Sequence, residues 1–241
     1  MTARQTSDVT HSMTGLYRRH DRIIPGRGSR PDHDEQGDGH VIELSAAPMT
    51  WVATGDSTTQ AVLHTHGARG WVEHVHERIR WQLDRLTDIV VNSGVSAWRA
   101  GDVLGAYDHL IGRFGPDVLS ISLGTNDARA GLAGLSRFHT DLRAIVARAD
   151  GARIVLHTPV LTSVSGRVAR PELPAYCQAV REIAHDTGAL LVDHEAHWLA
   201  RFPDTDPIPW LDDAAHPNAV GHLEMANHTL RTLGLGELTD L

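Results

Sequence analysis

Over most of the chain, short apolar runs alternate with segments whose apolar residues recur at helical spacing. The run DVLSISLG is almost continuously apolar, as a strand buried in a parallel sheet should be. In another segment, Trp71, Val75 and Ile79 line one stripe of a helix. The pattern predicts strands at 50–55, 88–92, 117–124, 152–159 and 189–193. It predicts helices at 71–83, 100–114, 135–149, 171–188 and 217–234.

Strands that alternate with helices in this way predict a doubly wound α/β fold. The expected architecture is a three-layer α/β/α sandwich around a five-stranded parallel sheet. The N-terminal segment has a different composition and is rich in Gly, Pro, Asp, Arg and His, for example in PGRGSRPDHDEQGDGH at 25–40. We therefore expect residues 1–48 to form an N-terminal extension that is partly mobile, and residues 49–241 to form the folded domain.

Composition narrows the class of protein. The chain has 241 residues, of which 41% are hydrophobic, and this is enough for one large core. The formal net charge is −8 and there is no long basic block, so nucleic acid is not expected as a partner. Lysine is absent, which excludes a Schiff-base lysine and a P-loop lysine. The single cysteine, Cys177, excludes an intramolecular disulfide and a CxxC pair.

The apolar runs also bear on location. None approaches the roughly 20 residues that a membrane-spanning helix needs. The segment 1–28 lacks the apolar core of a secretory signal peptide. We therefore expect a cytoplasmic protein without a membrane span.

Polar and glycine residues follow the predicted strands. Because the carboxyl ends of parallel strands meet at one edge of a sheet, we expect these residues to come together there. They are, in chain order, Gly55-Asp56-Ser57, Asn92-Ser93-Gly94, Gly124-Thr125-Asn126-Asp127, and the segment LDDAAHPN at 211–218 before the last helix.

These residue types are those of acyl-transfer chemistry. Ser57 is the candidate nucleophile, and a serine hydroxyl needs a base to remove its proton. His216 is the candidate base, since it directly precedes Pro217 at the start of the last predicted helix. Asp213, three residues earlier, could accept from the imidazole Nδ1–H and leave Nε2 for the serine. Asp212 is the alternative acid, which the spacing to His216 favours less.

The tetrahedral intermediate of such a reaction carries a negative oxygen that needs hydrogen-bond donors. The candidate oxyanion-hole residues are Ser57 and Gly94 through their backbone N–H groups and Asn126 through its side-chain amide. Glycine at position 94 would permit close approach of the backbone to substrate. Asp56, adjacent to the nucleophile, is expected to bond local N–H groups and hold the turn.

In this order, the blocks resemble the SGNH (GDSL) hydrolase superfamily, which is named for Ser, Gly, Asn and His in four separate blocks. They match GDST (Ser57), NSGVS (Gly94), GTND (Asn126) and DAAH (Asp213 and His216). The Gly-Trp pair at 70–71 is similar to that of the small bacterial lysophospholipase-like esterases. The sequence departs from many members at Thr58, where an aliphatic residue is common.

The resemblance implies a flavodoxin-like fold in an SGNH hydrolase domain and a short helical turn that carries Ser57. It implies a serine esterase that cleaves a small to medium carboxylic ester through a Ser-His-Asp triad and an acyl-enzyme, with no metal or organic cofactor. One alternative is an acyltransferase or tailoring enzyme of a small-molecule pathway that uses the same triad. Another is a non-catalytic binding module that has kept the fold.

Histidines and tryptophans raise further questions. The 17 histidines suggest a metal site, with the closest groupings at 64 and 66, 74 and 76, and 194 and 197. None has an obvious third carboxylate ligand at motif spacing, so no metal is expected.

Trp98 and Trp210 flank the second and last blocks, and we expect that either could line the substrate pocket.

Overall fold

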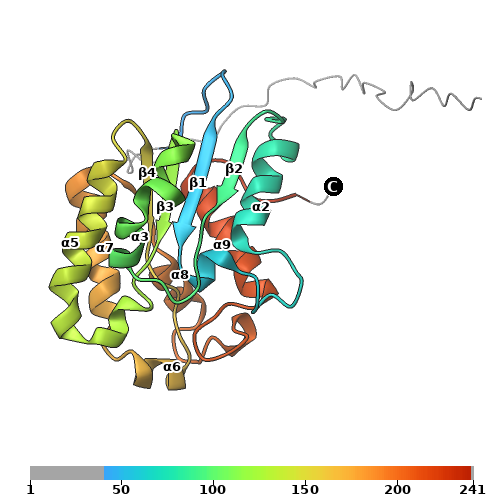
Figure 1. Cartoon of the computed structure of the whole chain (residues 1–241). Helices are drawn as coiled ribbons and strands as arrows, with labels where there is room; N and C mark the ends of the chain where they lie inside the picture. The colour runs from blue at the N-terminus through green and yellow to red at the C-terminus, as the bar shows by residue number, and fades with distance from the viewer. Residues whose placement is uncertain (1–40, 240–241) are drawn as a thin grey trace, which may run out of the picture. The chain divides into compact units, whose positions relative to one another are not determined.

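The computed structural model describes residues 41–239. A parallel sheet of five strands, in the order β2-β1-β3-β4-β5, lies at its centre. Helices cover both faces of the sheet (Figure 1), so the predicted three-layer architecture is confirmed. The strands are β1 (Thr50–Gly55), β2 (Ile89–Asn92), β3 (Val118–Ser122), β4 (Arg153–His157) and β5 (Leu190–Val192).

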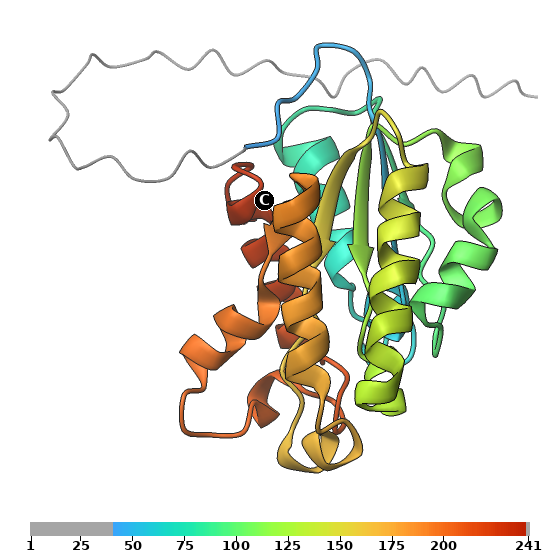
Figure 2. The same cartoon turned by 90° about the vertical axis from the view of Figure 1, so that its left-hand side faces the viewer.

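Alternate side chains of the strands pack into two separate cores. In β1, Trp51 and Ala53 enter one core, whereas Val52 enters the other. The first core is covered by α2 (Trp71–Glu77), α8 (His194–Arg201) and α9 (Ala219–Thr232). The second is covered by α3 (Ala100–Gly105), α4 (Tyr107–Leu110), α5 (Leu132–Arg148) and α7 (Leu173–Thr187). Figure 2 shows α5 and α7 side by side on this second face.

Two predicted helices are interrupted. The segment 71–83 continues from α2 into a π-helical turn, η1 (Arg78–Gln82). The segment 100–114 divides into α3, α4 and the 3₁₀ turn η2 (Gly112–Phe114), because Ala106 leaves the helical conformation at φ −105° and ψ 17°. The apolar stripe continues across this break through buried residues on both sides, so the pattern alone could not reveal it.

Several short helices were not predicted from periodicity. Helix α8 begins after Asp193, whose side chain accepts a hydrogen bond from Ala196 N–H, and this cap was a usable sequence signal. Helix α6 (Val164–Ala169) begins in the same way after Ser163, which accepts from Gly166 N–H. The other short elements are α1 (Ser57–Gln60), η3 (Asp127–Ala130) and η4 (Ile208–Trp210).

Residues 1–40, most of the predicted N-terminal extension, lie outside the described residues. Residues 41–48 contact the sheet domain. Ile42 is buried, and its N–H donates to the Leu233 carbonyl at 3.2 Å. Arg85 donates to the Ser45 carbonyl at 2.7 Å. Within 41–239, no helix is both long and apolar enough to cross a membrane, and the cytoplasmic location stays a prediction.

A chain of histidines lies between the sheet and the α8–α9 layer. His157 Nδ1 is 3.1 Å from His194 Nε2, and His194 Nδ1 is 3.3 Å from His228 Nδ1. Burial lowers the pKa of His157 to about 3 and that of His228 to about 4, and it places the pKa of His194 well below its ordinary value. Burial likewise lowers the pKa of His222 in α9 to about 4. The folded protein therefore holds these rings in the neutral form.

Acid is expected to destabilise the fold between about pH 6.5 and pH 4. Above the ordinary histidine pKa of 6.5 these rings are neutral in both states. Below it, the unfolded chain takes up protons that the folded chain excludes, so stability falls. Asp56 and Asp127, whose pKa values burial raises to about 6, act in the opposite direction. They are outnumbered by the four histidines, and burial also lowers the pKa values of His74, His76 and His197. We expect a Tm about 5–10 °C lower at pH 5 than at pH 7.5 in thermal unfolding.

Substitution of one of the four histidines tests whether these rings cause the loss of stability in acid. His228→Asn removes a half-buried titrating ring and should reduce the difference in Tm between the two pH values. His185, which lies exposed on α7, provides the control, and His185→Ala should leave the difference unchanged. Equal Tm values for the unmodified protein at pH 5 and pH 7.5 would show that the buried rings do not set acid stability.

Candidate active site

The turn after β1 presents Ser57 at the first position of α1. Asp56 is the N-cap: its Oδ1 accepts from Thr58 N–H at 2.9 Å. Burial raises the pKa of Asp56 to about 6, although the Thr58 N–H opposes the change. A side chain on Gly55 would place its Cβ 2.4 Å from the Ser122 carbonyl of the neighbouring strand, so only glycine fits where β1 turns into α1. The turn thus holds Ser57 at the carboxyl edge of the sheet.

The loop before α9 brings an imidazole to this hydroxyl. His216 Nε2 lies 2.9 Å from Ser57 Oγ. The loop is closed by a bridge between Leu211 and Pro217 and by a hydrogen bond from Asp212 N–H to the His216 carbonyl at 2.8 Å. Helix α9 starts two residues later than predicted, because Asn218 rather than Pro217 begins it as the N-cap.

Asp213 binds the other side of the same imidazole. Its Oδ1 and Oδ2 lie 2.9 Å and 2.8 Å from His216 Nδ1. Oδ1 also accepts from the backbone N–H groups of Ala215 and His216, each at 2.8 Å. Burial acts to raise the pKa of Asp213, but these N–H groups and the imidazole outweigh it and lower the pKa to about 2. The structure thus brings Ser57, His216 and an ionised Asp213 into one hydrogen-bonded line.

Asp212, the alternative acid, bonds other histidines. Its Oδ2 lies 2.9 Å from His64 Nδ1, and its Oδ1 lies 2.7 Å from His66 Nε2. The His64 ring stacks on the His216 ring, with centroids 3.7 Å apart and planes 7° from parallel. His64 and His66, which were considered as joint metal ligands, both bond this one carboxylate.

Among the described residues, donor atoms of His64, Asp213 and His216 lie within 4.8 Å of one another, a separation small enough for a shared metal ion. Face-to-face rings, however, direct their nitrogen lone pairs in parallel planes. One ion cannot lie in both planes, so these two imidazoles could ligate it together only after a ring rotation. The expectation of no metal stays a prediction.

The three candidate oxyanion donors lie around α1. As the first residue of the helix, Ser57 has an N–H without a carbonyl partner in its own helix. A Cβ at Gly94 would lie 2.5 Å from Gln60 N, so the glycine allows this strand end to contact α1. Gly94 N–H itself donates to Asn92 Oδ1 at 3.1 Å. Asn126 Nδ2 donates to Asp56 Oδ2 at 3.3 Å and to the Trp98 carbonyl at 3.2 Å.

The two tryptophans differ in their surroundings. Trp98 is half-buried, and its carbonyl helps to hold Asn126. Trp210 is 8% exposed and packs edge-on against Trp198 and Phe202, with ring centroids 5.1 Å and 4.8 Å away. Most of Trp210 is therefore core, and only its exposed edge could meet a substrate.

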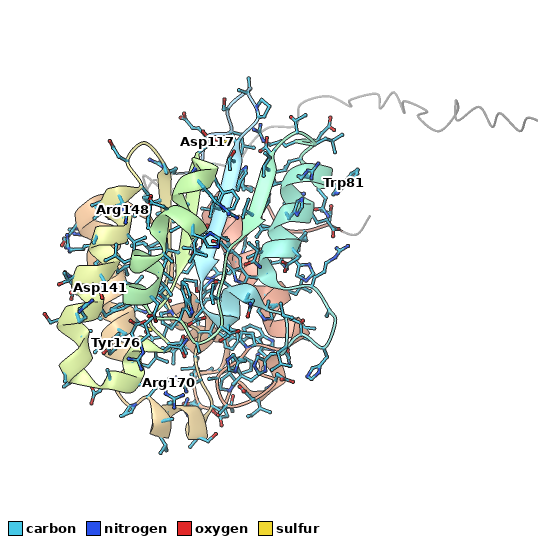
Figure 3. The ribbon with its side chains drawn as sticks, in the orientation of Figure 1. Trp81, Asp117, Asp141, Arg148, Arg170 and Tyr176 are labelled. Atoms are coloured by element: carbon cyan, nitrogen blue, oxygen red, sulfur yellow. The ribbon has the colours of Figure 1, made fainter. Side chains whose placement is uncertain are left out.

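Arg170 is a charged residue at this edge that the sequence offers, with Arg167, only as a possible contact to an acidic substrate group. Its side chain is buried, and Nε donates to the Thr125 carbonyl at 2.9 Å. Its charge interacts with the carboxylates of Asp56 and Asp213. Figure 3 shows it beside α6, whereas Asp117 lies at the opposite edge of the sheet. The sequence signal for this placement was that Arg170 follows β4, in the connection to α7, and such connections begin at the carboxyl edge of the sheet.

Comparison with known proteins shows the family. Residues 53–223 match the model of the GDSL-like lipase/acylhydrolase family, and the match includes all five candidate residues of the triad and oxyanion hole. The chain belongs to the GDSL-like lipase/acylhydrolase family. The superfamily resemblance is therefore confirmed, and the chain is an ester-hydrolysing serine hydrolase.

Two groups of relatives add detail. An acetylxylan esterase from Geobacillus stearothermophilus is 26% identical over 179 residues, which are 68% of this chain and 81% of that protein. A solved structure of an acetyl xylan esterase variant from the same organism has a TM-score of 0.67 and 24% identity, covering 80% of this chain and 97% of that one. The solved structure of an α/β hydrolase from the metagenome of Lake Arreo, Spain, has a TM-score of 0.68 and 23% identity. The match covers 79% of this chain and 97% of that one. The structural likenesses show the fold.

Proposed function

We propose that this hydrolase cleaves carboxylic esters of small to medium size through an acyl-enzyme on Ser57. The observation that carries the proposal is the line from Ser57 Oγ to His216 Nε2 and from His216 Nδ1 to Asp213. An ionised carboxylate can only accept, so Nδ1 must carry a proton and Nε2 is left with the lone pair. In this tautomer the imidazole is a base toward the serine.

The reaction would proceed in two halves. Ser57 Oγ attacks the acyl carbonyl while its proton passes to His216 Nε2. His216 then protonates the leaving alcohol as the tetrahedral intermediate collapses to the acyl-enzyme. In the second half the same nitrogen takes a proton from water as the water oxygen attacks the acyl carbon. It then returns that proton to Ser57 Oγ as the second tetrahedral intermediate collapses and releases the acid. Asp213 stays ionised throughout and stabilises the imidazolium.

The developing oxyanion would bind the Ser57 and Gly94 N–H groups and the Asn126 amide. In the free enzyme, Gly94 and Asn126 donate to protein acceptors. Oxyanion binding would exchange the Gly94 bond to a neutral amide oxygen and the Asn126 bond to the Trp98 carbonyl for shorter bonds to a full negative charge, which are the stronger kind. Catalytic hydrogen bonds commonly tighten only when the substrate is bound.

Asn126→Ala is expected to lower kcat on the order of 10²–10³-fold with little change in KM, because the lost donor acts on charge that develops in the transition state. The measurement is steady-state hydrolysis of an activated ester, with Tm measured in parallel, since the variant also loses the bond to Asp56. A kcat within threefold of the unmodified protein, at unchanged Tm, would exclude Asn126 from the oxyanion hole.

The substrate is tested with a panel of esters. Acetylated xylo-oligosaccharides belong in it because the similar curated protein is an acetylxylan esterase. p-Nitrophenyl esters of rising chain length would measure the acyl preference. We expect turnover to be highest for short acyl chains and free acid to be the main product. The comparisons do not favour the acyltransferase alternative, but ester formation faster than hydrolysis in the presence of alcohol acceptors would replace our proposal with it.

A further inference from the structure

A second histidine–carboxylate pair lies against the candidate catalytic pair. His64, in the loop after α1, stacks on His216 with ring centroids 3.7 Å apart and planes 7° from parallel. Asp212 Oδ2 lies 2.9 Å from His64 Nδ1, and Oδ2 of the adjacent Asp213 lies 2.8 Å from His216 Nδ1. His64 lies between the first and second blocks that define the superfamily resemblance, so these blocks give it no role.

The two imidazole rings have the same orientation, with Nδ1 of each directed at a carboxylate of the Asp212–Asp213 pair. His64 Nδ1 lies 2.9 Å from Asp212 Oδ2 and 4.0 Å from Asp213 Oδ2, while His216 Nδ1 lies 2.8 Å from the same Asp213 oxygen. Both Nδ1 edges therefore face the neighbouring carboxylates. Because an ionised carboxylate only accepts, both rings carry the proton on Nδ1 when neutral.

The stack removes a freedom that the Asp213 bonds leave to His216. Hydrogen bonds at Nδ1 fix one edge of the imidazole, but the ring can still tilt about that edge and carry Nε2 away from Ser57 Oγ. A parallel ring at 3.7 Å blocks the tilt on one side. It also places an electron-rich face against His216 when that ring becomes an imidazolium, an attractive arrangement.

On the basis of the proposed function, we propose that His64, anchored by Asp212, is a positioning residue that keeps His216 Nε2 directed at Ser57 during the proton transfers of both half-reactions. His64 acts through His216 and not on the substrate. The Asp212 carboxylate is held in place by a second histidine, since its other oxygen lies 2.7 Å from His66 Nε2.

The charged and titratable groups around the stack set the expected pH behaviour. Asp212, Asp213 and His66 face it from the two loops. His222 faces it from α9, and the Arg170 charge acts on Asp213. Asp212→Asn removes one negative charge beside the stack, and the loss of a negative charge makes a neighbouring imidazole harder to protonate. The acid limb of the kcat/KM profile should therefore move to lower pH in this variant.

Three variants test the proposal through steady-state kinetics on one activated ester. His64→Ala should lower kcat about 10- to 100-fold with KM nearly unchanged, as expected for a misdirected base. His64→Phe keeps a flat ring in the stack and should recover most of the lost kcat. Asp212→Asn should give an intermediate kcat and the shifted acid limb. His185→Ala, which removes an exposed histidine beside Asp186 on α7, is the matched control and should behave as the unmodified protein.

Thermal unfolding of each variant separates positioning from folding. A His64→Ala protein with normal kcat overturns the proposal, and so does a His64→Phe protein that folds normally but is as slow as the alanine variant. If His64→Ala does not fold, the pH dependence of kcat/KM for Asp212→Asn is the deciding measurement. A shift of its acid limb to lower pH supports the proposal, and no shift overturns it. Ser57→Ala and His216→Ala are assayed alongside. Activity retained in those two would refute the proposed function itself, whereas their inactivity with normal His64 variants would refute only the role of His64.

Discussion

Replacing Ser57 with alanine is expected to lower kcat for ester hydrolysis on the order of 10⁵–10⁶-fold. The reason is that Ser57 Oγ is the hydroxyl bonded to His216 Nε2, at 2.9 Å, and alanine leaves no oxygen there to attack the acyl carbonyl. What activity is left would come from substrate binding and the oxyanion donors. Hydrolysis of p-nitrophenyl acetate, followed over hours to reach the low rates, measures the loss.

The fold should survive this substitution. Ser57 is half-buried at the first position of α1, and the cap comes from Asp56, so the variant should keep its Tm within a few degrees. Ser136→Ala on the exposed side of α5 is the matched control and should retain full activity. Ester turnover by a folded Ser57→Ala protein at more than a hundredth of the normal rate would mean that another group is the nucleophile.

The second large effect is expected for Asp213→Asn, which should lower kcat on the order of 10³–10⁴-fold at pH 7.5. An amide can donate to Nδ1 and so favour the tautomer whose Nε2 carries the proton. That tautomer cannot take a proton from Ser57. The neutral amide also gives up the charge that stabilises the imidazolium, and kcat measured at saturating substrate reports both losses.

The neighbouring carboxylate is the natural comparison. Asp212→Asn changes the same kind of group one residue away, but its oxygens bond His64 and His66. Its loss of kcat should be at least tenfold smaller than that of Asp213→Asn, in keeping with a role through the stacked ring. If Asp212→Asn were the more damaging of the two, the assignment of the triad acid would be reversed.

The sheet could be predicted from the sequence because each strand carries its own signal. A run such as 117–124 is apolar throughout, and burial on both faces is a local requirement that shows in composition. Helix interruptions carry no such signal. Val103 and Tyr107 are buried on either side of the break at Ala106, so the apolar stripe is the same whether or not the backbone stays helical.

The nucleophile and the candidate oxyanion donors could also be predicted, because the carboxyl ends of parallel strands share one edge and therefore bring Ser57, Gly94 and Asn126 together. The stacking of His64 on His216 could not. His64 lies in a loop whose path is set by contacts with Asp212, 148 residues further along the chain, and no local pattern encodes a pairing at that distance. Arg170 is similar, since it is buried with its Nε bonded to the Thr125 carbonyl, 45 residues earlier in the chain.

The most direct test of the central claim is to locate the covalent adduct of a fluorophosphonate probe by peptide mass spectrometry. We predict a single adduct on Ser57, formed within minutes by the unmodified protein, formed far more slowly by His216→Ala, and absent from Ser57→Ala. An adduct on a different residue, or an active protein that forms no adduct at all, would contradict the account.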